Sequence, residues 1–79
     1  MNVNEFEEVL DPMNANRVVV ISETWGRNWV RKKVYFNVGV GCGVGKCLRY
    51  VIDNYSDVLG CDIRIDTYNV RNGRAIGRC

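Results

Sequence analysis

At 79 residues, the chain has room for one domain with a small core, because short chains bury only a modest share of their surface. A hydrophobic fraction of 47% and a charged fraction of 25% exclude an intrinsically disordered chain, and no window has the apolar length that a membrane span requires. The formal net charge of +2 indicates neither a strongly basic nor a strongly acidic protein. The N-terminus lacks the basic and apolar stretches of a secretory signal, which favours a cytoplasmic location.

The first element that we expect is a short acidic helix over residues 1–12. Asn4 suits its N-cap position, and Phe6 and Val9 would lie on its apolar face. Asp11 would end the helix, because a residue that precedes proline is disfavoured in helical geometry.

Two strands joined by a hairpin turn are expected next. The consecutive β-branched residues Val18–Ile21 predict a strand that is buried on both faces. The segment Trp25–Trp29 has the composition of a hairpin turn, and Val34–Val40 alternates apolar and polar residues as a half-buried strand does. The three cations of Arg31–Lys33 would point to both faces of this strand, so we expect them at its exposed end.

A glycine-rich turn and an amphipathic helix follow. Apolar residues recur at the spacing of one helix face, namely at Val44, Cys47, Leu48, Val51, Ile52 and Tyr55. Gly60 would cap the C-terminus of this helix in the left-handed conformation.

The last part of the chain predicts a third strand and a sharp turn. Residues Ile63–Tyr68 alternate in the pattern of a strand, and Asn72-Gly73 is typical of a type I′ hairpin turn. Residues Arg74–Cys79 form either a fourth strand or the start of a helix. The expected order is therefore α-β-β-α-β-β. We predict a single α+β domain over residues 1–79, a two-layer sandwich in which one main helix packs on a sheet of about four strands within 17–79.

The four cysteines are Cys42, Cys47, Cys61 and Cys79. In a reducing cytosol we expect free thiols with a structural role. The gaps between them contain no C-x2-C pair, and the chain has no histidine, so we expect no zinc or other metal. No catalytic set of residues is evident either.

The glycine-rich segment Gly39–Lys46 follows a strand and precedes a helix, which is the arrangement that binds anions with backbone N–H groups. Segment Val40–Gly45 resembles the Q/R-x-x-G-x-G/A pyrophosphate loop of the GNAT N-acetyltransferases. Segments Ile63–Asp66 and Asn72–Ile76 resemble the next strand and the Asn-x-x-Ala motif of that family. The alternative is a structural turn that lets a strand approach a helix closely.

This resemblance spans residues 34–79 and implies an abbreviated acetyltransferase that holds acetyl-CoA with loop N–H groups. The cofactor-binding residues that it implies are Gly41, Cys42, Gly43, Val44, Gly45 and Asn72.

The second candidate site is a basic and aromatic surface on the two hairpins. Its partner-binding residues are Trp25, Arg27, Trp29, Arg31, Lys32, Lys33, Arg71, Arg74 and Arg78, with Tyr35 nearby. Cations mixed with exposed aromatic rings suit phosphate contact and base stacking or contact with an acidic protein. The alternative is that both tryptophans complete the small core.

The sequence favours a small intracellular binding or regulatory module without chemistry or a cofactor of its own, such as a phage or mobile-element inhibitor. Its macromolecular partner would be an acidic protein surface or a nucleic acid, and the chain could also form a homodimer. The alternative is the GNAT-like enzyme, which requires the amides of Gly41–Gly45 to face an open V between splayed strands. The binding module requires instead that Arg71, Arg74 and at least one tryptophan are exposed.

Overall fold

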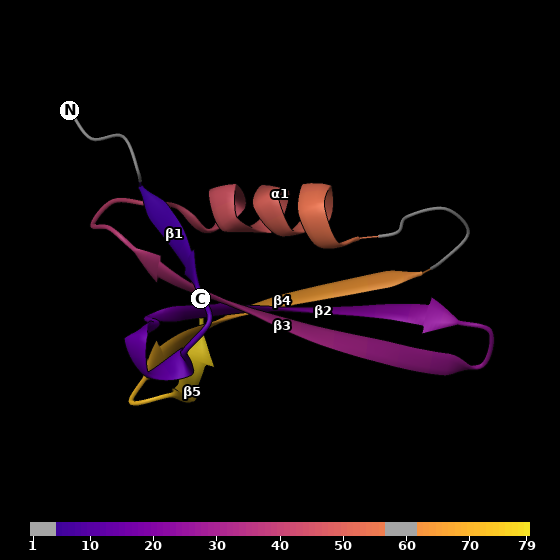
Figure 1. Ribbon diagram of the computed structural model, residues 1–79. Coiled ribbons are helices and arrows are strands. Elements are labelled where there is room, and N and C mark those ends of the chain that lie inside the picture. Colours follow the sequence, from indigo (N-terminus) through magenta and orange to yellow (C-terminus); the bar gives the residue numbers. More distant parts are fainter. Residues whose placement is uncertain (1–4, 57–61) are drawn as a thin grey trace.

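A five-stranded antiparallel sheet is formed by the described residues, 5–56 and 62–79, of the computed structural model. The strands are β1 (Phe6–Val9), β2 (Arg17–Trp25), β3 (Asn28–Val38), β4 (Ile63–Arg71) and β5 (Arg74–Arg78). Their order in the sheet is β1-β3-β2-β4-β5. The helix α1 (Val44–Tyr55) lies along one face, whereas the short 3-10 helix η1 (Pro12–Asn14) and β5 lie on the other side at one end (Figure 1). The fold is therefore α+β, as predicted.

The predicted N-terminal acidic helix is wrong, because Phe6–Val9 forms the edge strand β1, which pairs with β3. The ring of Phe6 packs edge to face on Phe36 and Tyr50, at centroid distances of 5.7 and 5.6 Å. A helix this short has little stability of its own, so pairing with β3 and burial of Phe6 decide the conformation. The order is thus β-β-β-α-β-β. Asn4, the expected cap, lies outside the described residues.

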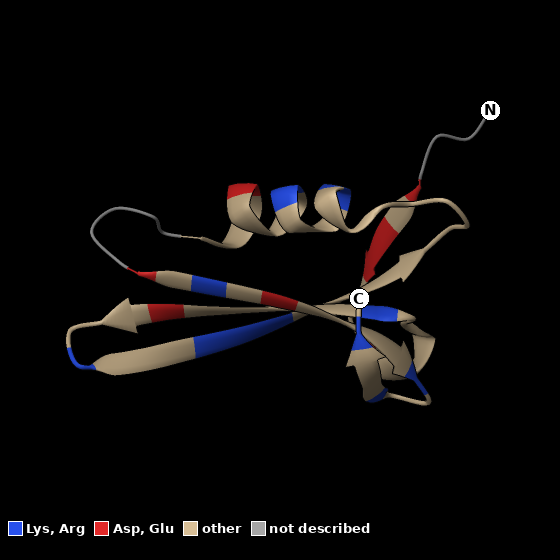
Figure 2. Ribbon diagram, turned by 180° about the vertical axis from the view of Figure 1, so that it is seen from behind, with Lys and Arg blue, Asp and Glu red and all other residues tan. Residues whose placement is uncertain are grey.

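The long β2–β3 hairpin confirms the two predicted strands and their turn. Pairing runs from Arg17–Phe36 to Trp25–Asn28, and Gly26 in the turn has a φ of +63°. The cations of Arg31–Lys33 pair with the middle of β2, not with an exposed end as expected (Figure 2). They are exposed there because β1 pairs only with Tyr35–Val38, so this part of β3 is an edge of the sheet.

The core lies between α1 and the sheet. Val19, Ile21 and Phe36 from the strands are fully buried against Cys47 and Val51 of the helix. This confirms the centre of the predicted apolar helix face.

The ends of the predicted helix face differ from the prediction. Ile52 is 37% exposed, whereas Tyr50, which is not among the predicted positions of this face, packs against the core. The helix ends at Tyr55, and Ser56 is extended, so the helix does not continue toward Gly60, which lies outside the described residues. None of the helices in the described part of the chain is long and apolar enough to cross a membrane.

The second half of the chain completes the sheet on the other side of β2. Strands β3 and β4 both pair antiparallel with β2, so they run parallel to each other with β2 between them. The predicted turn at Asn72-Gly73 is confirmed, since φ is 53° and 78° at these residues. The chain after this turn forms strand β5, which decides between the two alternatives for Arg74–Cys79.

Candidate functional site

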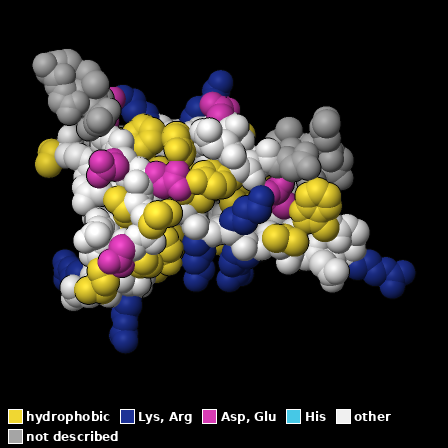
Figure 3. Space-filling model, viewed as in Figure 1, with side chains coloured by type: hydrophobic (Ala, Val, Ile, Leu, Met, Phe, Trp, Pro, Cys, Tyr) yellow, Lys and Arg dark blue, Asp and Glu magenta, His cyan; other side chains and the backbone are white. Residues whose placement is uncertain are grey.

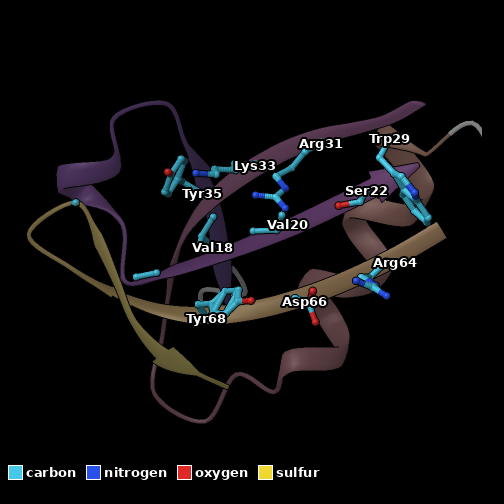
Figure 4. Close-up of a pocket in the computed structure, with 12 residues that line it drawn as sticks. Val18, Val20, Ser22, Trp29, Arg31, Lys33, Tyr35, Arg64, Asp66 and Tyr68 are labelled. Carbon is cyan, nitrogen blue, oxygen red and sulfur yellow. The ribbon is translucent and has the colours of Figure 1, made fainter. Parts of the chain in front are cut away.

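The sheet face opposite α1 contains a hollow of about 890 Å³ (Figure 4). Its lining residues are Val18, Val20, Ser22, Trp29, Arg31, Lys33, Tyr35, Arg64, Asp66, Tyr68, Gly73 and Ala75. We call this surface the open face, because α1 covers the opposite face of the sheet and the short helix η1 lies only at one end of this one (Figure 1).

The hollow follows from the sizes of the side chains on three neighbouring strands. The central strand β2 contributes the small residues Val18, Val20 and Ser22, which form the floor. Large residues on β3 and β4 form the two walls, and because neighbouring strands lie about 4.8 Å apart, the walls stand about 10 Å apart. Gly73 lies at one end of the hollow. It is in close contact with Met13 of η1, because a Cβ added at this glycine would lie 3.1 Å from the Met13 sulfur.

Aromatic rings lie at both ends of the hollow. Tyr35 and Tyr68 face Val18 from either side and pack with it in a small second core. Trp29 is 56% exposed at the other end. It lies six residues from Tyr35 on β3, which is about 20 Å along the strand. The guanidinium carbon of Arg78 lies 5.8 Å from the centroid of the Tyr68 ring, within the range of a cation–π contact.

Positive charge lies between these rings. Arg31 and Arg64 flank Ser22 from opposite strands, and with Lys33 they are the cations among the described lining residues, all exposed. The acidic residue of the lining, Asp66, accepts a hydrogen bond of 2.8 Å from Arg78. In Figure 3, dark blue side chains project from the lower side of the molecule, away from α1. The open face is therefore positive at its centre.

Arg78 interacts with both Tyr68 and Asp66 at the rim of the hollow. A hydrogen bond with Tyr68, together with the nearby Asp66 carboxylate, raises the pKa of Arg78. The guanidinium lies over the Tyr68 ring.

The predicted partner-binding residues are divided among several surfaces. Trp29, Arg31 and Lys33 line the open face, and Arg78 lies at its rim. Lys32 lies on the helix side, where its Nζ donates to the Tyr55 carbonyl at 3.1 Å and lies 3.7 Å from the Glu23 carboxylate.

The remaining predicted residues lie outside the hollow. Arg27 is in the β2–β3 turn, and Trp25 is placed on the helix side by strand alternation. Arg71 and Arg74 pair across the start of the β4–β5 hairpin and are exposed. The alternative that the tryptophans complete the core is wrong, since Trp25 and Trp29 are 52% and 56% exposed.

Sequence reasoning missed Arg64 and Tyr68 as site residues. The alternation of Ile63–Tyr68 had already put these two side chains on one face of a strand, and this was the available signal. Their position opposite the β3 residues depends on β2 lying between β3 and β4, which no local pattern indicates.

The glycine loop lies on the other side of the sheet from Asn72. It connects β3 to α1, with Gly43 as the N-cap residue, whereas Asn72 is in the β4–β5 turn beside η1 (Figure 1). The carbonyls of Cys42 and Gly43 accept hydrogen bonds of 3.4 Å from Arg17. Because β2 pairs with both β3 and β4, these described strands form no open V of the kind that the acetyl-CoA hypothesis requires.

The thiols of the described residues are free at Cys42, Cys47 and Cys79. Burial raises the pKa of Cys47, although its hydrogen bond from Arg17 acts in the opposite direction, so this thiol stays protonated. In the described parts of the chain, no group of three or more His, Cys, Asp or Glu side chains could hold a metal ion. Cys61 lies outside the described residues.

Comparison of the chain with protein-family models, with curated proteins and with solved structures found no match. The resemblance of residues 34–79 to the GNAT N-acetyltransferases therefore has no support from a family match, and the open face is the better candidate site.

Proposed function

We propose that the protein is a small binding module that engages nucleic acid through its open face. The observation that supports this proposal is the combination of three exposed cations with aromatic rings on one sheet face that α1 leaves uncovered. Arg and Lys side chains hold phosphate groups, and flat rings stack on bases. The module would act by occupying its partner, without chemistry of its own.

The position of the charges favours nucleic acid over an acidic protein. Protein interfaces usually place apolar residues at the centre and charges at the rim, because a charge buried at the centre loses its hydration. Here Arg31, Lys33 and Arg64 lie between the ring of Trp29 at one end of the hollow and that of Tyr35 at the other, with Arg31 and Arg64 nearer to Trp29. Phosphates suit this arrangement, since they form charge-assisted hydrogen bonds with such side chains.

Two of the acidic residues near the N-terminus, Glu5 and Glu8, do not compensate this positive charge. Glu8 accepts hydrogen bonds from the helix residues Tyr50 and Tyr55, and Glu5 pairs with Lys46 of the same helix. These carboxylates are thus engaged on the helix side, so the cations of the open face remain available to an external anion.

Fluorescence anisotropy with a labelled oligonucleotide at several salt concentrations tests the proposal. Three phosphate contacts predict a slope of log K against log[salt] of about −2 for a single strand, which is a loss of about 16-fold for a fourfold rise in salt. The triple variant Arg31→Gln, Lys33→Gln, Arg64→Gln should lose this binding.

A matched control removes the same number of charges elsewhere, in the variant Arg27→Gln, Arg71→Gln, Arg74→Gln. It has the same net charge as the test variant and should keep most of the affinity. Equal losses in the two triple variants would refute the open face as the site and indicate a net-charge effect. Binding to polyglutamate but to no oligonucleotide would assign the face to an acidic protein.

A further inference from the structure

We infer that the open face selects single-stranded over duplex nucleic acid, with unpaired bases stacked on Trp29 and Tyr35 and phosphates held by Arg31, Lys33 and Arg64. This inference rests on the proposed function and names the form of nucleic acid that the same site takes. It follows from the placement of the rings relative to the cations.

Trp29 is the ring best placed to receive a base. More than half of its surface is exposed, and it lines the same end of the hollow as Arg31 and Arg64 (Figure 4). A base stacked on the indole would place its own phosphates near these two cations. Exposure of a large apolar ring next to cations has no role in the core, since Trp29 belongs to neither buried cluster.

The other end of the hollow offers a second platform. Tyr35 is half-buried, with its ring supported from below by the second core around Val18. On the opposite wall, the Arg78 guanidinium lies over Tyr68 and is fixed there by Asp66. Guanidinium planes stack on bases as aromatic rings do, so this end presents a tyrosine ring and a restrained arginine plane to a second base.

The shape of the hollow favours one strand over two. Its walls stand about 10 Å apart, given the spacing of neighbouring strands, and the path from Trp29 to Tyr35 is about 20 Å along β3. A duplex keeps its bases stacked on one another, so it can offer the face phosphates, sugars and base edges but no free π-face for the rings. An unpaired strand can use both the cations and the rings, because each of its bases has a free π-face.

The test compares three labelled probes of equal length by anisotropy: a single-stranded oligonucleotide, its blunt duplex and an abasic strand. We expect the single strand to bind more tightly than the other two probes at matched salt. The Trp29→Ala variant should weaken single-strand binding about 5- to 150-fold, the range for loss of one stacked base, with an unchanged salt slope. Trp29→Phe, which keeps a ring, should recover most of the loss.

Trp25→Ala is the matched control, because Trp25 is similarly exposed on the same hairpin but on the helix side. It should leave all affinities unchanged, and circular dichroism verifies that each variant is folded. If the duplex and abasic probes bind as well as the single strand and Trp29→Ala has no effect, stacking is overturned while the proposed function stands. If none of the probes binds, the proposed function itself fails.

Discussion

Glu8 joins the edge strand β1 to the helix, and its removal is a quantitative test of the fold. Its carboxylate accepts hydrogen bonds from the hydroxyl groups of Tyr50, at 2.8 Å, and of Tyr55. Glu8→Gln keeps the shape but replaces two charge-assisted bonds with neutral ones, which differ by about 1 kcal/mol each. Because the site is only partly buried, we expect a loss of about 1–2 kcal/mol in the free energy of unfolding. That loss lowers Tm by about 4–16 °C for a domain of this size.

The pH dependence gives this prediction a second readout. The hydrogen bond to Glu8 raises the pKa of Tyr55 to about 12 and also raises that of Tyr50. A group whose pKa is raised by folding stabilises the folded state fully below its unfolded pKa, here about 10, and this contribution is lost as the pH rises through the folded pKa. The difference in stability between the parent protein and Glu8→Gln should therefore shrink between pH 10 and about 12.

Urea unfolding at several pH values and titration of the tyrosinate absorbance measure both effects. In Glu8→Gln, the high-pH part of the tyrosine titration should move toward pH 10. Glu7→Gln is the control, because Glu7 is exposed on the same strand. The reasoning is refuted if the tyrosine titration does not change in Glu8→Gln, or if Glu7→Gln destabilises the protein equally.

Three further predictions concern the core, the turns and the thiols. Phe36 is fully buried and has two edge-to-face ring contacts. Phe36→Leu should therefore lower the free energy of unfolding by about 1–3 kcal/mol, measured by chemical denaturation. A change near zero would contradict this packing. Gly73→Ala should destabilise the protein more than Gly26→Ala does in thermal unfolding. Both glycines have positive φ, but a new Cβ would meet a neighbouring side chain at Gly73 and not at Gly26. The reverse order would contradict the contact between Gly73 and η1. Alkylation followed by peptide mass mapping should modify exposed Cys79 fast and buried Cys47 only on unfolding, and equal rates would refute the burial of Cys47.

Local rules of sequence were sufficient for most elements of this fold. Alternating residues predicted the strands that became β3 and β4, because a strand with one buried face repeats every two residues, and a run of β-branched residues predicted β2. Helical periodicity predicted the start of α1 and its buried residues Cys47 and Val51. The positive φ values that a type I′ turn needs were predicted by Asn72-Gly73 and are present there.

Local rules failed where two conformations fit the same few residues. The segment Phe6–Val9 has apolar residues at a spacing that a short helix also accepts, and it became a strand because β3 offered a free edge and Phe36 a packing partner. The end of the helix was also misplaced, since α1 ends at Tyr55 and Ser56 is extended.

The candidate site, too, was predicted only in part from the sequence. The sequence by itself determined that cations and aromatic residues occur together on the hairpins, and alternation separates Arg31 and Lys33 from Lys32. Only the tertiary structure decided that β2 is the central strand, which brings Arg64 to the same hollow as Trp29. The physical reason is that strand order depends on pairing between segments far apart in the chain, whereas alternation and turn geometry depend on neighbouring residues alone.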